Sequence, residues 1–129
     1  INLEWGRDNR TTGIRIPVSL PEARRVENRL AGMDCNPYLC IAASLACGYL
    51  GMKNEIRPDK RWRGDAYEAE DEIPQGLYAA LDLFDEADAM HDVLGPEFAR
   101  VYSIVKRAEY NEFLQVISPW EREHLLLNV

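Results

Sequence analysis

One stretch of the sequence, residues 9–29 (NRTTGIRIPVSLPEARRVENR), contains five arginines, two glutamates and no lysine. Arginine has a planar fork of donors that binds carboxylate or phosphate oxygens in pairs, and its charge does not titrate away. Residues two apart in a strand share a face, so Arg25, Glu27 and Arg29 are expected to point together. A carboxylate between two guanidinium groups keeps its charge, can bind Mg²⁺ or Mn²⁺, and lies where those donors can hold an anionic ligand.

Two further arginines could point at the same place. Arg15 lies on the neighbouring predicted strand and Arg10 at the turn before it. The alternative interpretation is a solvated sheet face, on which arginine and glutamate pairs contribute a few tenths of a kcal/mol and no chemistry. Charge alternation alone does not distinguish these interpretations.

The arginine-rich stretch contrasts with the rest of the chain, which is acidic. The 129 residues carry a net charge of -7 and a pI near 4.8. Residues 1–30 hold six Arg against four acids, a net of +2, so the remainder carries -9. An acidic chain repels a phosphate backbone, which argues against nonspecific nucleic-acid binding and favours a small anionic ligand.

Length and composition indicate one soluble globular domain, because 129 residues with 47% hydrophobic side chains suffice for an ordinary core. The longest apolar run, residues 38–52, is interrupted by Ser44, Gly48 and Gly51. It falls short of the roughly 18 residues that a membrane-spanning helix needs. We therefore expect a buried helix and no membrane partner.

The three cysteines, Cys35, Cys40 and Cys47, are odd in number and lack the spacing of a metal or redox motif. They are expected to be small buried residues of a protein in the reducing cytoplasm. The sequence shows no secretory signal and begins at Ile1 without a methionine, so we expect a fragment or a processed product.

The order of the patterns predicts an α+β fold. A few antiparallel strands are expected within about residues 1–30, and about five helices within about residues 36–129. Asn36 is a good N-cap and Pro37 suits the first helical position, so the first helix should begin there. That helix is apolar on nearly every side and is expected to form the centre of the core.

Later helices are expected where apolar residues recur at helical spacing, from Leu77 and again from Pro96. A last helix should start at SPWE, where Ser118 and Glu121 complete a capping box. His91 and His124 are lone histidines, for which structural roles outweigh metal binding.

The polar segment between the first two helices, residues 54–73, is long for a connection inside a compact domain. Segments of this size are usually functional, disordered or in contact with another subunit. Trp62, flanked by two arginines, could anchor such a subunit contact.

Four motifs occur in one order: an NR[ST] turn in DNRTTG, an IR-[IV]-P strand in IRIP, an RR-[IV]-E-x-R strand in RRVENR, and an alanine-rich helix led by NPYL. Together they resemble the glutamine synthetase family, in the C-terminal part of its catalytic domain. The resemblance continues more weakly through IPQGLYAALDLF to the closing SPWEREHLLLNV, so residues 1–129 as a whole resemble that portion.

The resemblance implies a role for each residue of the arginine-rich group. Arg10 lies between ATP and glutamate and assists phosphoryl transfer. Arg15 and Arg25, with Arg10, contact the nucleotide phosphates. Glu27 is a ligand of a divalent metal, Mg²⁺ or Mn²⁺. Arg29 lies at the glutamate or phosphoryl position and is catalytic together with Arg10.

The reaction implied by the resemblance is an ATP-dependent ligation. The γ-phosphoryl group of ATP is placed on the side-chain carboxylate of glutamate, and ammonia then attacks the acyl phosphate to give glutamine. The full-length enzyme is implied to be a cytoplasmic homo-oligomeric ring of nitrogen metabolism. NRTTG and SPWEREHLLLNV favour instead the subgroup, typified by gamma-glutamylpolyamine synthetase, that joins glutamate to polyamines or other amines. A hypothesis of another class is a noncatalytic helical interaction module.

Two positions depart from the family pattern. Glu22 stands where many bacterial members have a lysine near the nucleotide. Tyr67 falls near the place of a tyrosine that some members modify by nucleotidyl transfer, but its surroundings differ, and an ordinary loop residue is the favoured interpretation. In the family, further metal-binding glutamates and the N-terminal domain precede the equivalent of residue 1. We therefore expect no ligase activity from these 129 residues alone.

Overall fold

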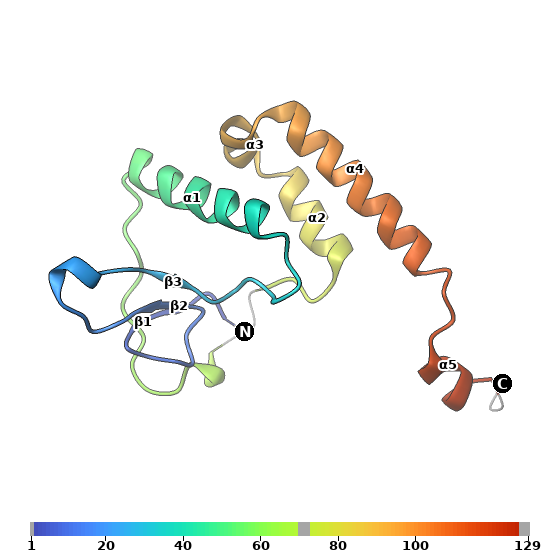
Figure 1. The fold of residues 1–129 in the computed structure, drawn as a ribbon, viewed down its shortest axis with the longest axis horizontal. Helices are drawn as coiled ribbons and strands as arrows, with labels where there is room; N and C mark the ends of the chain where they lie inside the picture. Colours follow the sequence, from blue (N-terminus) through green and yellow to red (C-terminus); the bar gives the residue numbers. More distant parts are fainter. Residues whose placement is uncertain (1, 70–72, 127–129) are drawn as a thin grey trace. The chain divides into compact units, whose positions relative to one another are not determined.

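The structure is a computed structural model, which describes residues 2–69 and 73–126. They form two compact units, which divide between Pro74 and Gln75. The first unit contains a small sheet, one long helix and two short 3-10 helices, and the second contains four α-helices (Figure 1). The predicted α+β class, with strands first and five α-helices in the described part of the chain, is confirmed.

The sheet has three very short strands in the order β1 (Trp5–Arg7), β2 (Ile14–Ile16) and β3 (Glu27–Asn28). The pairing of β2 with β3 is antiparallel, as predicted. The pairing of β1 with β2 is parallel, which corrects the expectation of antiparallel strands throughout.

The parallel pairing arises from the segment that joins β1 to β2. We call this segment, residues 8–13, the Arg10 turn. Asp8 has a φ of 54°, and the Asn9 side chain accepts a 3.0 Å hydrogen bond from the Thr11 amide. Asparagine and aspartate favour such locally bonded turns, which return the chain to the start of β1 in few residues.

A glycine in this turn permits a close backbone approach. A Cβ added at Gly13 would lie 2.0 Å from the carbonyl oxygen of Asn2 and 2.5 Å from Leu30 Cδ2. No real side chain tolerates such distances, so only glycine fits while Asn2 is held beside the turn.

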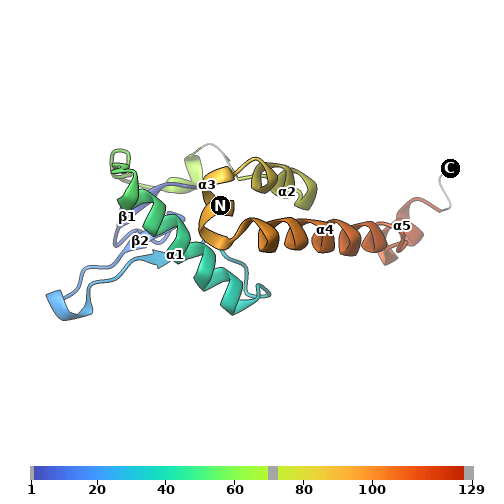
Figure 2. The ribbon, with the colours of Figure 1, turned by 90° about the horizontal axis from the view of Figure 1, so that it is seen from above.

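Helix α1 (Pro37–Lys53) begins as predicted, because the Asn36 side chain accepts hydrogen bonds from the amides of Tyr38 at 3.0 Å and Leu39 at 3.3 Å. The helix crosses one side of the sheet (Figures 1 and 2). A hydrogen bond of 2.9 Å from Asn28 Nδ2 to Ser44 Oγ joins it to β3.

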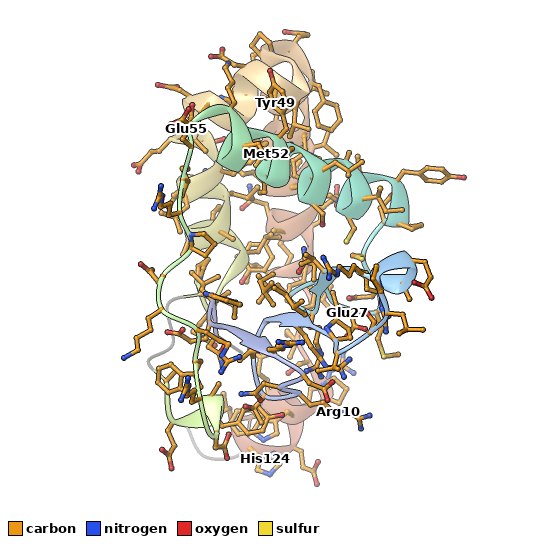
Figure 3. The ribbon with its side chains drawn as sticks, turned by 90° about the vertical axis from the view of Figure 1, so that its left-hand side faces the viewer. Arg10, Glu27, Tyr49, Met52, Glu55 and His124 are labelled. Carbon is orange, nitrogen blue, oxygen red and sulfur yellow. The ribbon has the colours of Figure 1, made fainter. Side chains whose placement is uncertain are left out.

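The expectation that α1 forms the centre of the core is wrong for the described part of the chain. Ala46 is its one buried residue, whereas Leu45 is 69% and Met52 76% exposed. Figure 3 shows Tyr49 and Met52 on this helix. A helix of 17 residues is about 25 Å long, while strands of three residues extend about 10 Å. The described sheet is therefore too small to cover a helix that is apolar on all sides.

Two 3-10 helices complete the first unit. The helix η1 (Pro21–Ala23) lies between β2 and β3, and η2 (Ala66–Glu68) lies in the polar segment after α1. Residues 54–69 of that segment are described and run back along the sheet to the Arg10 turn.

In the second unit, α2 (Leu77–Asp85) and α3 (Asp88–Leu94) pack on α4 (Pro96–Phe113). Among its described residues, Leu81, Ala99 and Ser103 are buried. Helix α5 (Pro119–His124) has the predicted capping box. No helix of the described ranges combines the length and apolarity needed to cross a membrane.

Candidate active site

Glu27 lies at the centre of the arginine-rich group. It stands on β3 directly opposite Arg15 on β2. Its Oε2 atom accepts a hydrogen bond of 2.8 Å from Arg15 Nη1. Its Oε1 atom is 2.9 Å from Arg25 Nη2 and accepts a 3.1 Å bond from Arg25 Nε. The structure thus brings together three of the five residues that the sequence singled out.

The arginines keep the Glu27 carboxylate ionised. The hydrogen bond from Arg15 is the largest influence, and with Arg25 it outweighs partial burial and holds the pKa of Glu27 below its ordinary value. In return, the hydrogen bond to Glu27 raises the pKa of the Arg15 guanidinium despite its burial. The pair therefore stays charged at neutral pH.

Asp8 is a member of the group that the sequence interpretation missed. Its Oδ1 atom accepts a hydrogen bond from Arg15 Nη2, so one guanidinium bridges two carboxylates. A signal was present, because Asp8 is an acidic residue only two positions before Arg10. Sequence spacing did not show that the parallel pairing of β1 with β2 would bring Asp8 beside Arg15.

Arg29 does not reach Glu27 through the described contacts. Its Nη1 atom donates instead to the main-chain carbonyl oxygen of Arg10, which ties the end of β3 to the Arg10 turn. The guanidinium of Arg10 has no hydrogen-bond or ion-pair partner within residues 2–69 and 73–126, and the residue is exposed. Figure 3 shows Arg10 and Glu27 at the sheet of the first unit.

The group has an excess of positive charge, with four arginines against Asp8 and Glu27. Both Nη atoms of Arg15 are occupied by the carboxylates, and its Nε atom is buried without a partner in the described structure. The Arg15 side chain is only 16% exposed, so a fully solvated sheet face does not describe it. Arg10 is the arginine whose fork is available to an anionic ligand.

The described residues around Glu27 do not form a complete ligand set for a divalent metal. No group of three or more His, Cys, Asp or Glu side chains that could hold a metal is present in the described ranges. Glu27 Oε1 contacts two nitrogens of Arg25, whereas Oε2 accepts one hydrogen bond, from Arg15, and keeps a second lone pair with which Glu27 can ligate a cation. The donor set fits one carboxylate of a shared site whose other ligands come from a phosphate, water or another segment.

The remaining sequence candidates have structural contacts. His91 Nε2 lies 2.7 Å from the carbonyl oxygen of Phe84, and the His124 ring stacks on Trp120. Trp62 donates through Nε1 to the Asp65 carbonyl oxygen at 3.2 Å, so its indole N–H has a partner within the chain. Tyr67 is exposed at the surface of η2.

The cysteines differ from the expectation of burial. Cys35 and Cys47 are exposed and Cys40 is partly exposed. Cys40 and Cys47 lie on α1, whose surface the small sheet leaves open, and Cys35 precedes the helix. Although Cys35 as a residue is exposed, local desolvation of its thiol raises the pKa of Cys35, and the hydrogen bond with Cys40 is the next largest cause.

The sheet places guanidinium groups around one ionised carboxylate on an α+β fold, an arrangement whose chemistry suits an anionic ligand. The profile of the family described as "Glutamine synthetase, catalytic domain" matches residues 1–125. The chain belongs to the glutamine synthetase family, as the motifs indicated.

Individual relatives include, by name, a glutamate–isopropylamine ligase, a gamma-glutamylputrescine synthetase and glutamine synthetases. The chain is 37% identical over 124 residues to glutamate–isopropylamine ligase of Pseudomonas sp, covering 93% of this chain and 27% of that protein. It is 38% identical over 125 residues to gamma-glutamylputrescine synthetase PuuA of Escherichia coli (strain K12), covering 96% and 26%. It is 29% identical over 136 residues to glutamine synthetase of Methanocaldococcus jannaschii, covering 98% and 30%. The chain therefore spans less than a third of the length of these curated relatives.

Proposed function

We propose that these residues are part of an ATP-dependent ligase that joins the side-chain carboxylate of glutamate to ammonia or to an amine. The observation that carries the proposal is the contact of Glu27 with both Arg15 and Arg25 in a chain that belongs to this family. A decayed, noncatalytic module would not be expected to retain an ionised carboxylate with its matched arginines.

Phosphoryl transfer suits this arrangement because it demands positioning and charge stabilisation rather than covalent chemistry from the protein. The guanidinium of Arg10 is exposed and has its fork available, so it would bind an oxygen of the transferring phosphoryl group. Arg29 would act beside it, since its Nη1 atom already binds the backbone that carries Arg10. Glutamate would bind near Arg10 and Arg29.

ATP would bind on the side of Arg15 and Arg25, with its phosphates facing the guanidinium groups around Glu27. The buried Nε of Arg15 is a donor without an acceptor in the described structure, which a phosphate oxygen could satisfy. Glu27 would supply one carboxylate ligand to Mg²⁺ or Mn²⁺, and the metal would neutralise phosphate charge. Asp8 would hold Arg15 in place from the opposite side.

The acceptor is proposed to be either ammonia, giving glutamine, or a larger amine, giving a gamma-glutamyl amine. Sequence identity does not distinguish these two acceptors. It is 37% and 38% to two amine ligases and 35% to glutamine synthetase of Archaeoglobus fulgidus. We further propose that the complete enzyme is a cytoplasmic homo-oligomeric ring, and that the 129 residues alone are inactive because their described part holds no complete set of metal ligands.

The test is phosphate release by the complete protein with Mg²⁺-ATP and glutamate, offering ammonia, putrescine, isopropylamine and ethanolamine in parallel. Turnover with ammonia alone would identify a glutamine synthetase, and preference for an amine would identify a glutamyl-amine ligase. A folded oligomer that binds ATP but turns over none of them would refute the proposal. Product formation by the isolated 129 residues would refute the expected inactivity of the piece.

A further inference from the structure

The polar segment after α1 is hydrogen-bonded both to β1 and to the Arg10 turn. We call residues 59–66 of this segment the strap. Trp5 Nε1 donates to the Asp59 carbonyl oxygen at 2.7 Å, and the Trp62 amide donates back to the Trp5 carbonyl oxygen at 3.0 Å. These bonds fix the first half of the strap to β1, although more than 50 residues separate the two in sequence.

The second half of the strap binds the two residues on either side of Arg10. Asn9 Nδ2 donates to the Gly64 carbonyl oxygen at 2.9 Å. Thr11 Oγ1 accepts from the Ala66 amide at 2.8 Å and donates to Asn9 Oδ1 at 2.8 Å. The backbone before Arg10 and the backbone after it are therefore both tied to the strap, and the Arg10 side chain remains outside these bonds.

Asn2 joins the strap and the turn through one buried amide. It is 3% exposed, and its Nδ2 atom donates to the carbonyl oxygens of Thr11 at 3.1 Å and Ala66 at 2.7 Å. Its Oδ1 atom accepts from the amides of Glu4 and Gly13, each at 3.2 Å. All four hydrogen-bonding positions of the amide are occupied.

We propose that the strap fixes the backbone of the Arg10 turn, and that Asn2 and Thr11 are the positioning residues that couple the two. The part of this proposal that concerns catalysis rests on the proposed ligase function, since it assigns Arg10 to the phosphoryl group. A reacting group has to be held in a narrow geometry, and an exposed arginine on a six-residue turn gains that restraint from the segment behind it. Displacement of the strap would then shift the backbone of Arg10 through the hydrogen bonds to Asn9 and Thr11.

The first test uses hydrogen exchange of the complete protein and requires no enzymatic activity. Asn2→Asp removes both donors and places a carboxylate against the carbonyl oxygens of Thr11 and Ala66, which is repulsive. We expect exchange of the Gly13 and Ala66 amides to accelerate together by about tenfold or more, the change that loss of a buried hydrogen-bond network predicts. Asn111→Asp is the matched control, because the Tyr78 hydroxyl can still donate to the new carboxylate. Unchanged exchange at Gly13 in Asn2→Asp would overturn the coupling.

The second test separates positioning from folding by using two substitutions of one residue. Thr11→Val keeps the shape but leaves the Ala66 amide without its acceptor, whereas Thr11→Ser keeps the hydroxyl. In the complete enzyme we expect Thr11→Val to lower kcat by about tenfold with a smaller change in the KM for ATP, and Thr11→Ser to restore most of it. Equal kcat in the two variants, with both folded by circular dichroism, would overturn the positioning role. If the unmodified protein turns over no substrate, the proposed function fails, and the exchange experiment still decides whether the strap holds the turn.

Discussion

Glu27 on β3 and Arg15 on β2 face each other across the sheet and share a hydrogen bond of 2.8 Å between Oε2 and Nη1. Arg15 is also bonded to Asp8, and Glu27 to Arg25, so the pair links three segments of the chain. The relationship places one ionised carboxylate among several guanidinium groups, and it leads to predictions about activity, pH and stability.

Removing the Glu27 charge should abolish turnover by the complete enzyme. Glu27→Gln keeps the size of the side chain but offers a metal and two arginines a neutral oxygen, so we expect kcat to fall by about 100-fold or more, as for a lost transition-state charge interaction. Phosphate release measures the effect, and manganese binding followed by electron paramagnetic resonance measures the metal affinity. Glu123→Gln, on the surface of α5, is the matched control. A Glu27→Gln enzyme with normal turnover would favour the solvated-face interpretation.

The same pair should make stability depend on pH in the acidic range. Because the folded pKa of Glu27 lies below its ordinary value of 4.5, the contribution of the pair is fully present above that value. It is lost as the pH falls through the lower, folded pKa, when the carboxylate becomes protonated. The melting temperature of the wild type should therefore drop more steeply below pH 4.5 than that of Glu27→Gln. Parallel curves for the two proteins would contradict the prediction.

Substitution by alanine at two glycines, Gly13 and Gly48, should change the stability of the protein in opposite directions. A Cβ at Gly13 would overlap the Asn2 carbonyl oxygen, so Gly13→Ala should destabilise the first unit by roughly 3 kcal/mol or more. Gly48, inside α1, has open space around its Cβ position, and Gly48→Ala should stabilise the helix by roughly 0.5–1 kcal/mol. Urea denaturation of the two variants measures both values. If Gly13→Ala left the free energy of unfolding unchanged, Asn2 and the Arg10 turn would separate more easily than their contacts indicate.

The contribution of the capping box to the stability of α5 should be measurable by hydrogen exchange within that helix. Ser118 Oγ accepts from the Glu121 amide at 3.1 Å, and Glu121 Oε2 accepts from the Ser118 amide at 2.7 Å. Ser118→Ala should destabilise α5 by about 1 kcal/mol. The readout is hydrogen exchange of the Leu125 amide, which bonds to the Glu121 carbonyl oxygen. Ser118→Thr keeps the cap and serves as the control, and similar exchange in the alanine and threonine variants would contradict the role of the cap.

The apolar surface of α1 should make the 129 residues associate when they are expressed alone. Ile41, Leu45 and Met52 are each more than half exposed, and large apolar patches of this kind promote association. Sedimentation velocity should show oligomers or aggregates that decrease in Leu45→Lys. The same substitution on exposed Leu83 of α2 is the comparison. A monodisperse monomer of the unmodified chain would contradict this prediction.

Much of the local structure followed from the sequence because its causes are local. The Asn36 cap, the Pro37 start of α1 and the Ser118 capping box depend on neighbouring side chains and backbone amides, and all three are confirmed. The grouping of Arg25 with Glu27 follows from the two-residue period of a strand and is also observed. The four motifs were sufficient to indicate the family.

Other features depend on how distant segments meet, and the sequence did not predict them. Asp8 joins Arg15 only because β1 and β2 run parallel, and Arg29 binds the Arg10 carbonyl only because β3 ends beside the Arg10 turn. The exposure of α1 likewise depends on what lies around it rather than on its own apolar composition.

By itself the sequence determined which residues carry the charge, where α1, α2, α4 and α5 begin and which family the chain belongs to, because these follow from side-chain types at short spacing. Only the tertiary structure decided that Glu27 binds both Arg15 and Arg25 while the Arg10 guanidinium stays available. It also decided that a segment more than 50 residues away is hydrogen-bonded to the turn that carries Arg10. Pairing geometry sets these contacts, and a period along one strand contains no information about the strand or loop that comes to lie next to it.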